Sequence, residues 1–208
     1  MKVIAINGSP HKDGAVHNSM TVLGGELEKA GIEVEQIHIG NKPIRGCMAC
    51  QKCRELKRCV FNDDAVNLCI DKIEAASGLI VGSPVYFGNI AGTLKCFLDR
   101  FFYAKPALQL KAAAAVVTLR RSGGIPAYHH IMDYFTLAQM LIVPTIYWNV
   151  VHGANGEEVH EDPEGMQIMR TAGKNMAWLI RTLEAGKKDI PYPVPENRLR
   201  TNFIRTRV

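Results

Sequence analysis

Apolar runs and segments of helical period alternate along almost the whole chain. The apolar runs that predict strands are 2–7, 33–39, 78–83, 112–119 and 142–151. The segments that predict helices are 17–30, 63–76, 91–103, 126–141 and 164–185. This alternation predicts an α/β fold, a doubly wound five-stranded parallel sheet with helices on both faces.

Three of the strand runs are continuously apolar and do not alternate with polar residues. They are Val3–Ile6, Leu79–Val81 and Ala113–Val117. Strands covered by helices on both faces have this pattern, so we expect these three to be central. Ligands of such sheets bind beyond the carboxyl ends of the strands, which directs attention to the turns that follow them.

Length and composition support one domain with two additions. The chain has 208 residues, 47% of them hydrophobic, which is enough for one sizeable core. We expect the domain to cover 1–186, with a loop at 40–62 inserted after the second strand. Residues 187–208 begin with a proline-rich stretch and predict an extended arm that contacts another subunit.

The inserted loop holds most of the cysteines. Four of the six fall within thirteen residues, with gaps of two, two and five, at Cys47, Cys50, Cys53 and Cys59. Thiolates so spaced can converge on one metal centre, and the short gaps favour an iron-sulfur cluster over structural zinc. A cysteine group that binds no metal is the other alternative. Cys69 and Cys96 lie in apolar helical patterns and are predicted to be core residues.

Charge and hydropathy limit the partners. The formal net charge is +5, and arginines near the end of the chain carry much of it. Aromatic residues are not interleaved with those arginines, so nucleic acid is not expected. No run is long and apolar enough to cross a bilayer, and the first strand follows Met1 directly. We expect a cytoplasmic protein without a membrane partner, in which thiols stay reduced.

The turn after the first strand is rich in hydroxyl, amide and cationic side chains. It contains Ser9, His11, Lys12, Asn18 and Ser19 at the start of a predicted helix. Such a turn suits a phosphate group, which would also meet backbone N–H groups. Neither G-x-G-x-x-G nor G-K-[ST] is present, so a monophosphate fits better than a dinucleotide. The alternative is a polar connection in which Asn18 or Ser19 caps the helix.

The turns after the third and fourth strands offer an aromatic pair and a basic segment. The first of them contains Pro84, Val85, Tyr86, Phe87 and Gly88. This segment suits the face and polar edge of a flat heteroaromatic ring, although aromatics at this position are often core. The other contains Thr118, Arg120 and Gly123. It suits a flavin edge or the phosphates of NAD(P)H, and a solvated basic turn is the alternative.

Four motifs occur in order along the chain. They are Asn7-Gly-Ser-Pro-His-Lys-Asp-Gly14, the cysteine loop followed by Asp63-Asp64, Ser83-Pro-Val-Tyr-Phe-Gly88, and Leu94-Lys-x-x-x-Asp99-Arg100. Over residues 2 to 152 the chain resembles the flavodoxin-like NADPH-dependent FMN reductases. Its cysteine run makes it similar to the iron-sulfur flavoprotein branch of that family.

The resemblance implies strand order 2-1-3-4-5, non-covalently bound FMN, and a homodimer or homotetramer. It implies that Ser9, His11, Asn18 and Ser19 hold the FMN phosphate. The segment 84–88 would contact the isoalloxazine ring, and 118–124 would contact its far side. One departure is the extra Ala15-Val16-His17 before Asn18.

The implied activity is an FMN-dependent oxidoreductase or electron-transfer flavoprotein. NAD(P)H or a ferredoxin-like donor would reduce FMN, and an acceptor would take the electrons, with a 4Fe-4S cluster as one route. The alternatives are a cluster-free FMN or quinone reductase and a non-enzymatic electron carrier or regulator. No catalytic side chain is nominated, because the flavin carries the chemistry. Basic residues around the cysteines, Lys52, Arg54, Lys57 and Arg58, favour an acidic redox partner such as ferredoxin.

Overall fold

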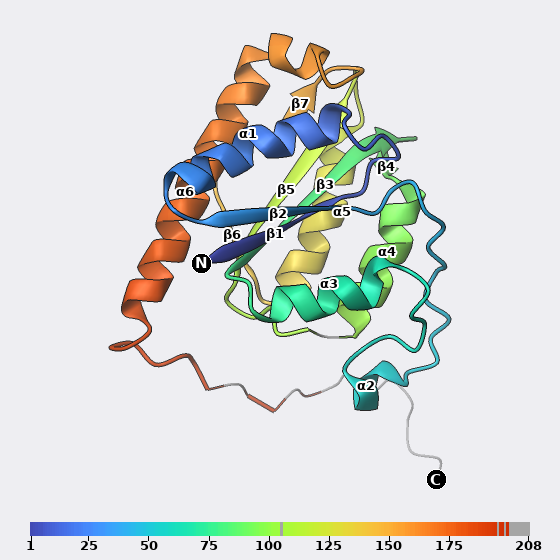
Figure 1. Cartoon of the computed structure of the whole chain (residues 1–208), viewed down its shortest axis with the longest axis vertical. Helices are drawn as coiled ribbons and strands as arrows, with labels where there is room; N and C mark the ends of the chain where they lie inside the picture. Colours follow the sequence, from blue (N-terminus) through green and yellow to red (C-terminus); the bar gives the residue numbers. More distant parts are fainter. Residues whose placement is uncertain (105, 195, 198, 200–208) are drawn as a thin grey trace.

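A twisted, mostly parallel sheet runs through the middle of the molecule and helices cover both of its faces (Figure 1). The computed structural model describes residues 1–104, 106–194, 196–197 and 199. Its strands are β1 (Lys2–Asn7), β2 (Glu33–His38), β3 (Gly78–Tyr86), β4 (Asn89–Ile90), β5 (Ala112–Leu119), β6 (Leu141–Ile142) and β7 (Val150–His152). Its helices are α1 (Ala15–Lys29), α2 (Cys53–Leu56), α3 (Ala65–Glu74), α4 (Gly92–Tyr103), α5 (Gly124–Leu137), the 3-10 helix η1 (Glu158–Glu161) and α6 (Pro163–Gly186).

The strand order is β2-β1-β3-β5-β6, which is the predicted order with β5 as fourth strand. The continuously apolar runs are the central strands, as expected, and every residue of β5 is buried. Helices α1 and α6 cover one face, and α3, α4 and α5 cover the other. Each face has its own apolar core, one around Phe97 and Phe101 and the other around Met20 and Met169. The doubly wound α/β prediction is therefore confirmed.

The predicted last strand, 142–151, is wrong as a single element. The structure has two short strands there, β6 and β7, both parallel to β5. Pro144 has no N–H to continue the ladder between them. The Asn149 side chain takes the place of a strand backbone, since its Nδ2 donates to the Ala115 carbonyl at 2.9 Å. The sheet edge is consequently irregular beside β5.

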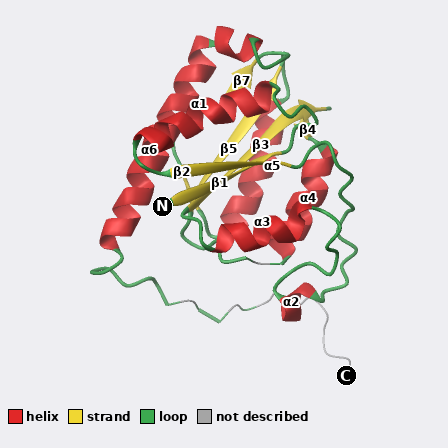
Figure 2. Ribbon diagram, in the orientation of Figure 1, coloured by secondary structure: helices red, strands yellow, loops and turns green. Residues whose placement is uncertain are grey.

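The inserted loop and the start of the arm lie outside the layered body (Figure 2). Between β2 and α3, the only helix is the four-residue α2, which begins at Cys53. After α6 the described part of the arm has no helix or strand, and it runs along the molecule toward the cysteine loop (Figure 1). The predicted arm to residue 208 lies mostly outside the described residues. Among those described, no helix has the length and apolar character needed to cross a membrane.

Candidate functional site

The turns after β1, β3 and β5 lie side by side at the carboxyl edge of the sheet. Asn7 is paired with Gly82, and the Gly8 N–H donates to the Gly82 carbonyl at 2.9 Å. A Cβ atom placed on Gly123 would lie 3.0 Å from Gly88 Cα, so the second and third turns touch. Tertiary structure thus brings together the three turns that the sequence singled out.

Asn7 organises the first turn from its buried position at the end of β1. Its Oδ1 accepts a hydrogen bond from the Ser9 N–H at 3.0 Å, and its Nδ2 donates to the Lys12 carbonyl at 3.1 Å. The buried Ser9 hydroxyl in turn accepts from the His11 N–H at 3.2 Å. Sequence reasoning missed Asn7; the signal was an asparagine at a strand end, where its side chain can close a turn.

The start of α1 has open donors for an anion. Its N-cap residue is Gly14, which supplies no capping side chain, and the first N–H groups of a helix lack partners within the helix. His11 and Lys12 are exposed on the turn. Ser19 is fully buried, and its Oγ has no hydrogen-bond partner within the described chain. Such an orphaned hydroxyl, with the open N–H groups, fits a phosphate.

Asn18 is used differently from the predicted phosphate contact. Its Nδ2 donates to the carbonyls of Asp13 and Gly14 at 3.0 and 3.1 Å. Its Oδ1 lies 3.3 Å from Nε2 of His160, which comes from η1. The side chain therefore braces the turn, and a contact with phosphate stays a prediction.

The second turn is a β-hairpin. Strand β3 extends to Tyr86 and pairs antiparallel with β4, with Tyr86 opposite Asn89. Phe87 and Gly88 both have positive φ, 50° and 72°, as a two-residue type I′ turn requires. The Phe87 side chain is fully exposed, which excludes the alternative that this aromatic belongs to the core.

The third turn ends β5 and begins α5. Thr118 is buried within the strand, whereas Arg120 is exposed, and Gly123 has φ 87° as the residue before the helix. Beside this turn is a cavity of about 300 Å³. Its lining includes Arg121, Ser122, Tyr147, Trp148 and His152. Sequence reasoning missed the Tyr147–Trp148 pair, because it fell within a run predicted as strand.

The four loop cysteines are free thiols near one another, but they do not form a closed metal cage. Cys47 and Cys50 are exposed, and Cys53 and Cys59 are half-buried. Burial raises the pKa of the Cys53 thiol, and its three neighbouring cysteines raise it further. Within the described chain, no three His, Cys, Asp or Glu side chains converge as a metal site would require.

The other two cysteines differ in their surroundings. Cys69 is buried in α3, and burial raises the pKa of its thiol to about 12, which confirms it as a core residue. Cys96 is only half-buried, and a Cβ on Gly46 would lie 3.9 Å from its sulfur. Cys96 is therefore not fully in the core, because it faces the cysteine loop.

The base of the cysteine loop is held by a buried ion pair that sequence reasoning did not assign. Arg100 of α4 pairs with Asp64, and their side chains are 1% and 4% exposed. Burial alone would lower the pKa of Arg100, but its bonds to Asp64 and Cys59 leave that pKa raised. Both residues belong to the four ordered motifs, but only packing shows that they meet.

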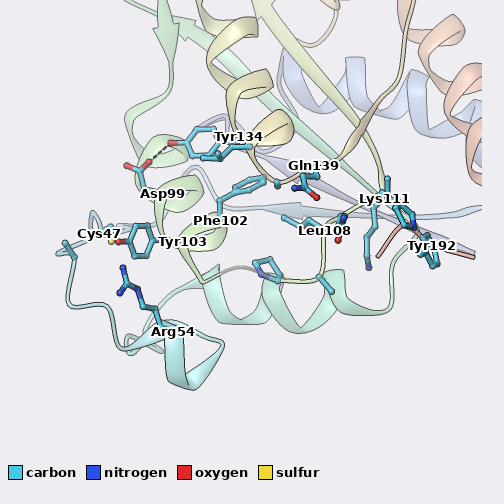
Figure 3. A pocket seen from close by; sticks show the side chains of 18 residues that line it. Cys47, Arg54, Asp99, Phe102, Tyr103, Leu108, Lys111, Tyr134, Gln139 and Tyr192 are labelled. Atoms are coloured by element: carbon cyan, nitrogen blue, oxygen red, sulfur yellow. Dashed lines mark hydrogen bonds between the residues drawn. The ribbon is translucent and has the colours of Figure 1, made fainter. Parts of the chain in front are cut away.

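A second and larger cavity, about 1280 Å³, lies away from the three turns. Figure 3 shows Cys47 and Arg54 of the cysteine loop near Tyr103 of α4, at one side of this cavity. Tyr134 of α5 donates to Asp99 on its wall; burial, followed by this bond, raises the pKa of Tyr134 to about 12. Lys111, which lies just before β5, marks the cavity as belonging to the amino edge of the sheet.

Comparison with known proteins places the chain in a family. Residues 1–155 match the NADPH-dependent FMN reductase family. An iron-sulfur flavoprotein of Methanocaldococcus jannaschii is 30% identical over 193 residues, covering 88% of this chain and 100% of the relative. An iron-sulfur flavoprotein of Methanosarcina thermophila is 30% identical over 201 residues, covering 90% of this chain and 99% of the relative.

Solved structures agree on the fold. An archaeal flavodoxin superposes with a TM-score of 0.59 at 15% identity, covering 87% of this chain and 99% of the flavodoxin. RosB, solved with a bound riboflavin-phosphate intermediate, superposes with a TM-score of 0.70 at 13% identity, covering 100% of this chain and 95% of RosB. These neighbours confirm the flavodoxin-like prediction. By its sequence matches, the chain belongs to the iron-sulfur flavoprotein branch of the NADPH-dependent FMN reductase family and is an FMN-dependent electron-transfer oxidoreductase.

Proposed function

We propose that this oxidoreductase takes electrons from NAD(P)H or a ferredoxin-like protein and delivers them to an acceptor, with a 4Fe-4S cluster as the exit for single electrons. The observation that carries the proposal is the meeting of three cofactor-suited turns in a chain that also presents four free thiols in one loop. When bound, FMN supplies the hydride and electron chemistry and a 4Fe-4S centre supplies one-electron steps.

The first turn is proposed to hold the FMN phosphate. The hydroxyls of Ser9 and Ser19 and the N–H groups at the start of α1 donate hydrogen bonds, Lys12 supplies a positive charge, and His11 supplies a further ring N–H donor. Asn18 keeps the turn in shape through its bonds to the Asp13 and Gly14 carbonyls. A turn already closed by its own side chains loses little conformational entropy when it binds its ligand.

The second and third turns are proposed to hold the isoalloxazine ring. The hairpin residues 84–88, with Pro84, Val85, Tyr86, Phe87 and Gly88, provide an apolar and aromatic surface. Thr118 pairs with Pro84 of the same hairpin and Gly123 lies against Gly88, while the exposed Arg120 follows β5 in the same turn. A cation at a flavin edge stabilises negative charge there. No side chain is given an acid, base or nucleophile role, because these residues bind, orient and exclude water.

The cysteine loop is proposed to hold the cluster on Cys47, Cys50, Cys53 and Cys59. The donor chemistry fits, since all four are free thiols in a loop with few buried residues. The names of the relatives in the iron-sulfur flavoprotein branch support the same assignment. Because the thiols are not converged, the loop must rearrange when the metal binds, as metal-ordered loops do.

A basic surface surrounds these cysteines, and we propose that it receives an acidic redox protein such as ferredoxin. Lys52, Arg54 and Lys57 are exposed there. Docking through charge would make the electron-transfer rate fall as salt rises, whereas a rate independent of salt would exclude this surface. A homodimer or homotetramer in the cytoplasm, with small-molecule donor and acceptor, completes the proposal.

The deciding experiment is a visible spectrum with iron and acid-labile sulfide analysis on protein purified without oxygen. Flavin bands with about four irons per chain would support the cluster. Flavin bands without iron would exclude it and leave an FMN or quinone reductase, for which the aromatic cavity beside the third turn is a suitable acceptor site. Steady-state NAD(P)H oxidation would then separate an enzyme from a passive electron carrier.

A further inference from the structure

The buried Arg100 side chain of α4 contacts the cysteine loop from beneath. Its Nε donates to the sulfur of Cys59 at 3.3 Å, and its NH1 and NH2 groups both donate to Asp64. The side chain is only 1% exposed, so its charge is compensated by partners within the protein. A charge-assisted bond to sulfur at such a depth is much less screened than a surface contact.

The same guanidinium group joins the two ends of the cysteine loop. It donates to the Arg45 carbonyl at 3.3 Å, before the first cysteine, and to the Phe61 carbonyl at 3.5 Å, after the last one. The Phe61 ring contacts two guanidinium groups, with its centroid 4.4 Å from that of Arg45 and 5.4 Å from that of Arg100. One side chain therefore holds both ends of the segment that carries the four cysteines.

Asp64 fixes Arg100 in this position. Its Oδ1 accepts from the Val66 N–H at 3.1 Å and so caps α3, while Arg100 belongs to α4. The ion pair consequently joins two helices of the core beneath the loop. Removing one partner of this buried pair would leave the other charge unpaired, so Arg100 and Asp64 each depend on the other to stay in place.

We propose that Arg100 is a positioning residue that presents Cys59 as a cluster ligand and, through its N–H···S bond, favours the reduced cluster. This inference rests on the proposed function, because it assigns a role toward the proposed 4Fe-4S centre. Hydrogen bonds to ligand sulfurs raise the reduction potential of such centres, since reduction adds negative charge that the donor stabilises.

The test compares the full-length wild type with Arg100→Gln, Arg100→Lys and the control Arg58→Gln. Arg58 is adjacent to Cys59 in sequence, but it is exposed and pairs with Asp71 on the surface. Amide hydrogen exchange is measured on metal-free protein, and the fraction of reduced cluster is measured by electron paramagnetic resonance at poised potentials on loaded protein. FMN binding and circular dichroism verify that each variant folds.

In Arg100→Gln we expect amides near Arg45 and Phe61 to exchange at least tenfold faster than in the wild type. At a fixed potential, the reduced-to-oxidised ratio of the cluster falls at least tenfold. This corresponds to a reduction potential lower by about 59 mV for a one-electron couple. Arg100→Lys keeps the charge but not the planar set of donors, so it restores part of the ratio and not the slow exchange. Arg58→Gln keeps the slow exchange, and its ratio falls much less than that of Arg100→Gln because water and salt screen the exposed Arg58 charge.

If Arg100→Gln loses its iron while FMN binding stays intact, that loss also supports the positioning role. The reduced-to-oxidised ratio of the cluster is then measured on Arg100→Lys. If Arg100→Gln fails to fold, Arg100→Lys decides both measurements. The proposal would be overturned if the Arg100 variants showed the same amide exchange rates and the same reduced-to-oxidised ratio as the wild type. It would also be overturned if Arg58→Gln changed both quantities as much as Arg100→Gln does. A wild type that contains no iron would remove the proposed cluster, and the exchange comparison alone would then decide whether Arg100 positions Cys59.

Discussion

Asn67 clamps the backbone of Cys59 at both of its polar groups. Its Oδ1 accepts from the Cys59 N–H at 2.9 Å, and its Nδ2 donates to the Cys59 carbonyl at 2.9 Å. Asn67 lies on α3 and is only 4% exposed. The last cysteine of the loop is therefore attached to the core, whereas the first two are exposed.

Replacement of Asn67 by Ala should lower the free energy of unfolding by about 1–3 kcal/mol, because buried backbone groups lose their partners. It should also lower the iron retained after purification without oxygen. Chemical denaturation and iron analysis measure the two effects. Asn41, an exposed asparagine at the start of the same loop, is the matched site, and Asn41→Ala should cost less than Asn67→Ala. Equal losses in the two variants would contradict the clamp.

Ser19 offers a test of the phosphate site, because its buried hydroxyl has no partner within the described residues. Ser19→Ala removes an unsatisfied group, so the FMN-free protein should keep its stability or gain up to about 1–2 kcal/mol. FMN affinity, measured by quenching of flavin fluorescence, should fall about tenfold if this hydroxyl binds phosphate. Thr171 donates its hydroxyl to the Gln167 carbonyl within α6, so the control Thr171→Ala should leave FMN affinity unchanged. Unchanged FMN affinity in Ser19→Ala would remove Ser19 from the site.

Gly40 touches the backbone of the phosphate turn. A Cβ there would lie 2.0 Å from the Ser9 carbonyl oxygen, so Gly40→Ala must displace that turn. Overpacking of this kind costs about 1–3 kcal/mol, and we expect at least tenfold weaker FMN binding by the same fluorescence titration. Gly25, in α1, has open space where a Cβ would lie, with no atom within 4 Å, which makes Gly25→Ala the control. That control should gain up to about 1 kcal/mol and bind FMN normally.

Protonation of the Asp162 carboxylate is expected to account for part of the stability that the fold loses in acid. Burial opposes its ionisation, but the N–H groups of His152 and Gly165 donate to its carboxylate and leave its pKa below the ordinary 3.8. A lowered folded pKa means that its stabilisation is present above pH 3.8 and is lost as pH falls through the folded value. Asp162→Ala should lose about 1 kcal/mol at pH 7, as expected for an N-cap.

The same variant should lose less stability than the wild type between pH 4 and pH 2, because the titrating group is gone. Denaturation with urea across this range measures both effects. Glu161→Ala, at an exposed neighbour, should follow the wild-type curve. A parallel acid loss in Asp162→Ala and wild type would show that this carboxylate does not contribute.

The predicted and observed elements differ where local signals compete with tertiary pairing. Continuous apolar runs identified β1, β3 and β5 because strands covered on both faces need no polar residues. The run 142–151 was equally apolar, but Pro144 interrupts the ladder and Asn149 bridges it with a side chain. The hairpin at Phe87 and Gly88 depends on two positive φ angles and on pairing with β4, which a phenylalanine at that position does not indicate.

By itself the sequence determined the doubly wound architecture, and it singled out the three strand-end turns and the cysteine loop, because periodicity and residue chemistry are local properties. The parallel order of the strands then implied that those turns meet. Only the tertiary structure decided that Asn7 closes the first turn, that Asn67 clamps Cys59 and that Arg100 joins the two ends of the cysteine loop. Each of these roles depends on groups brought together by packing, and the spacing of residues along a chain does not specify which buried polar groups become partners.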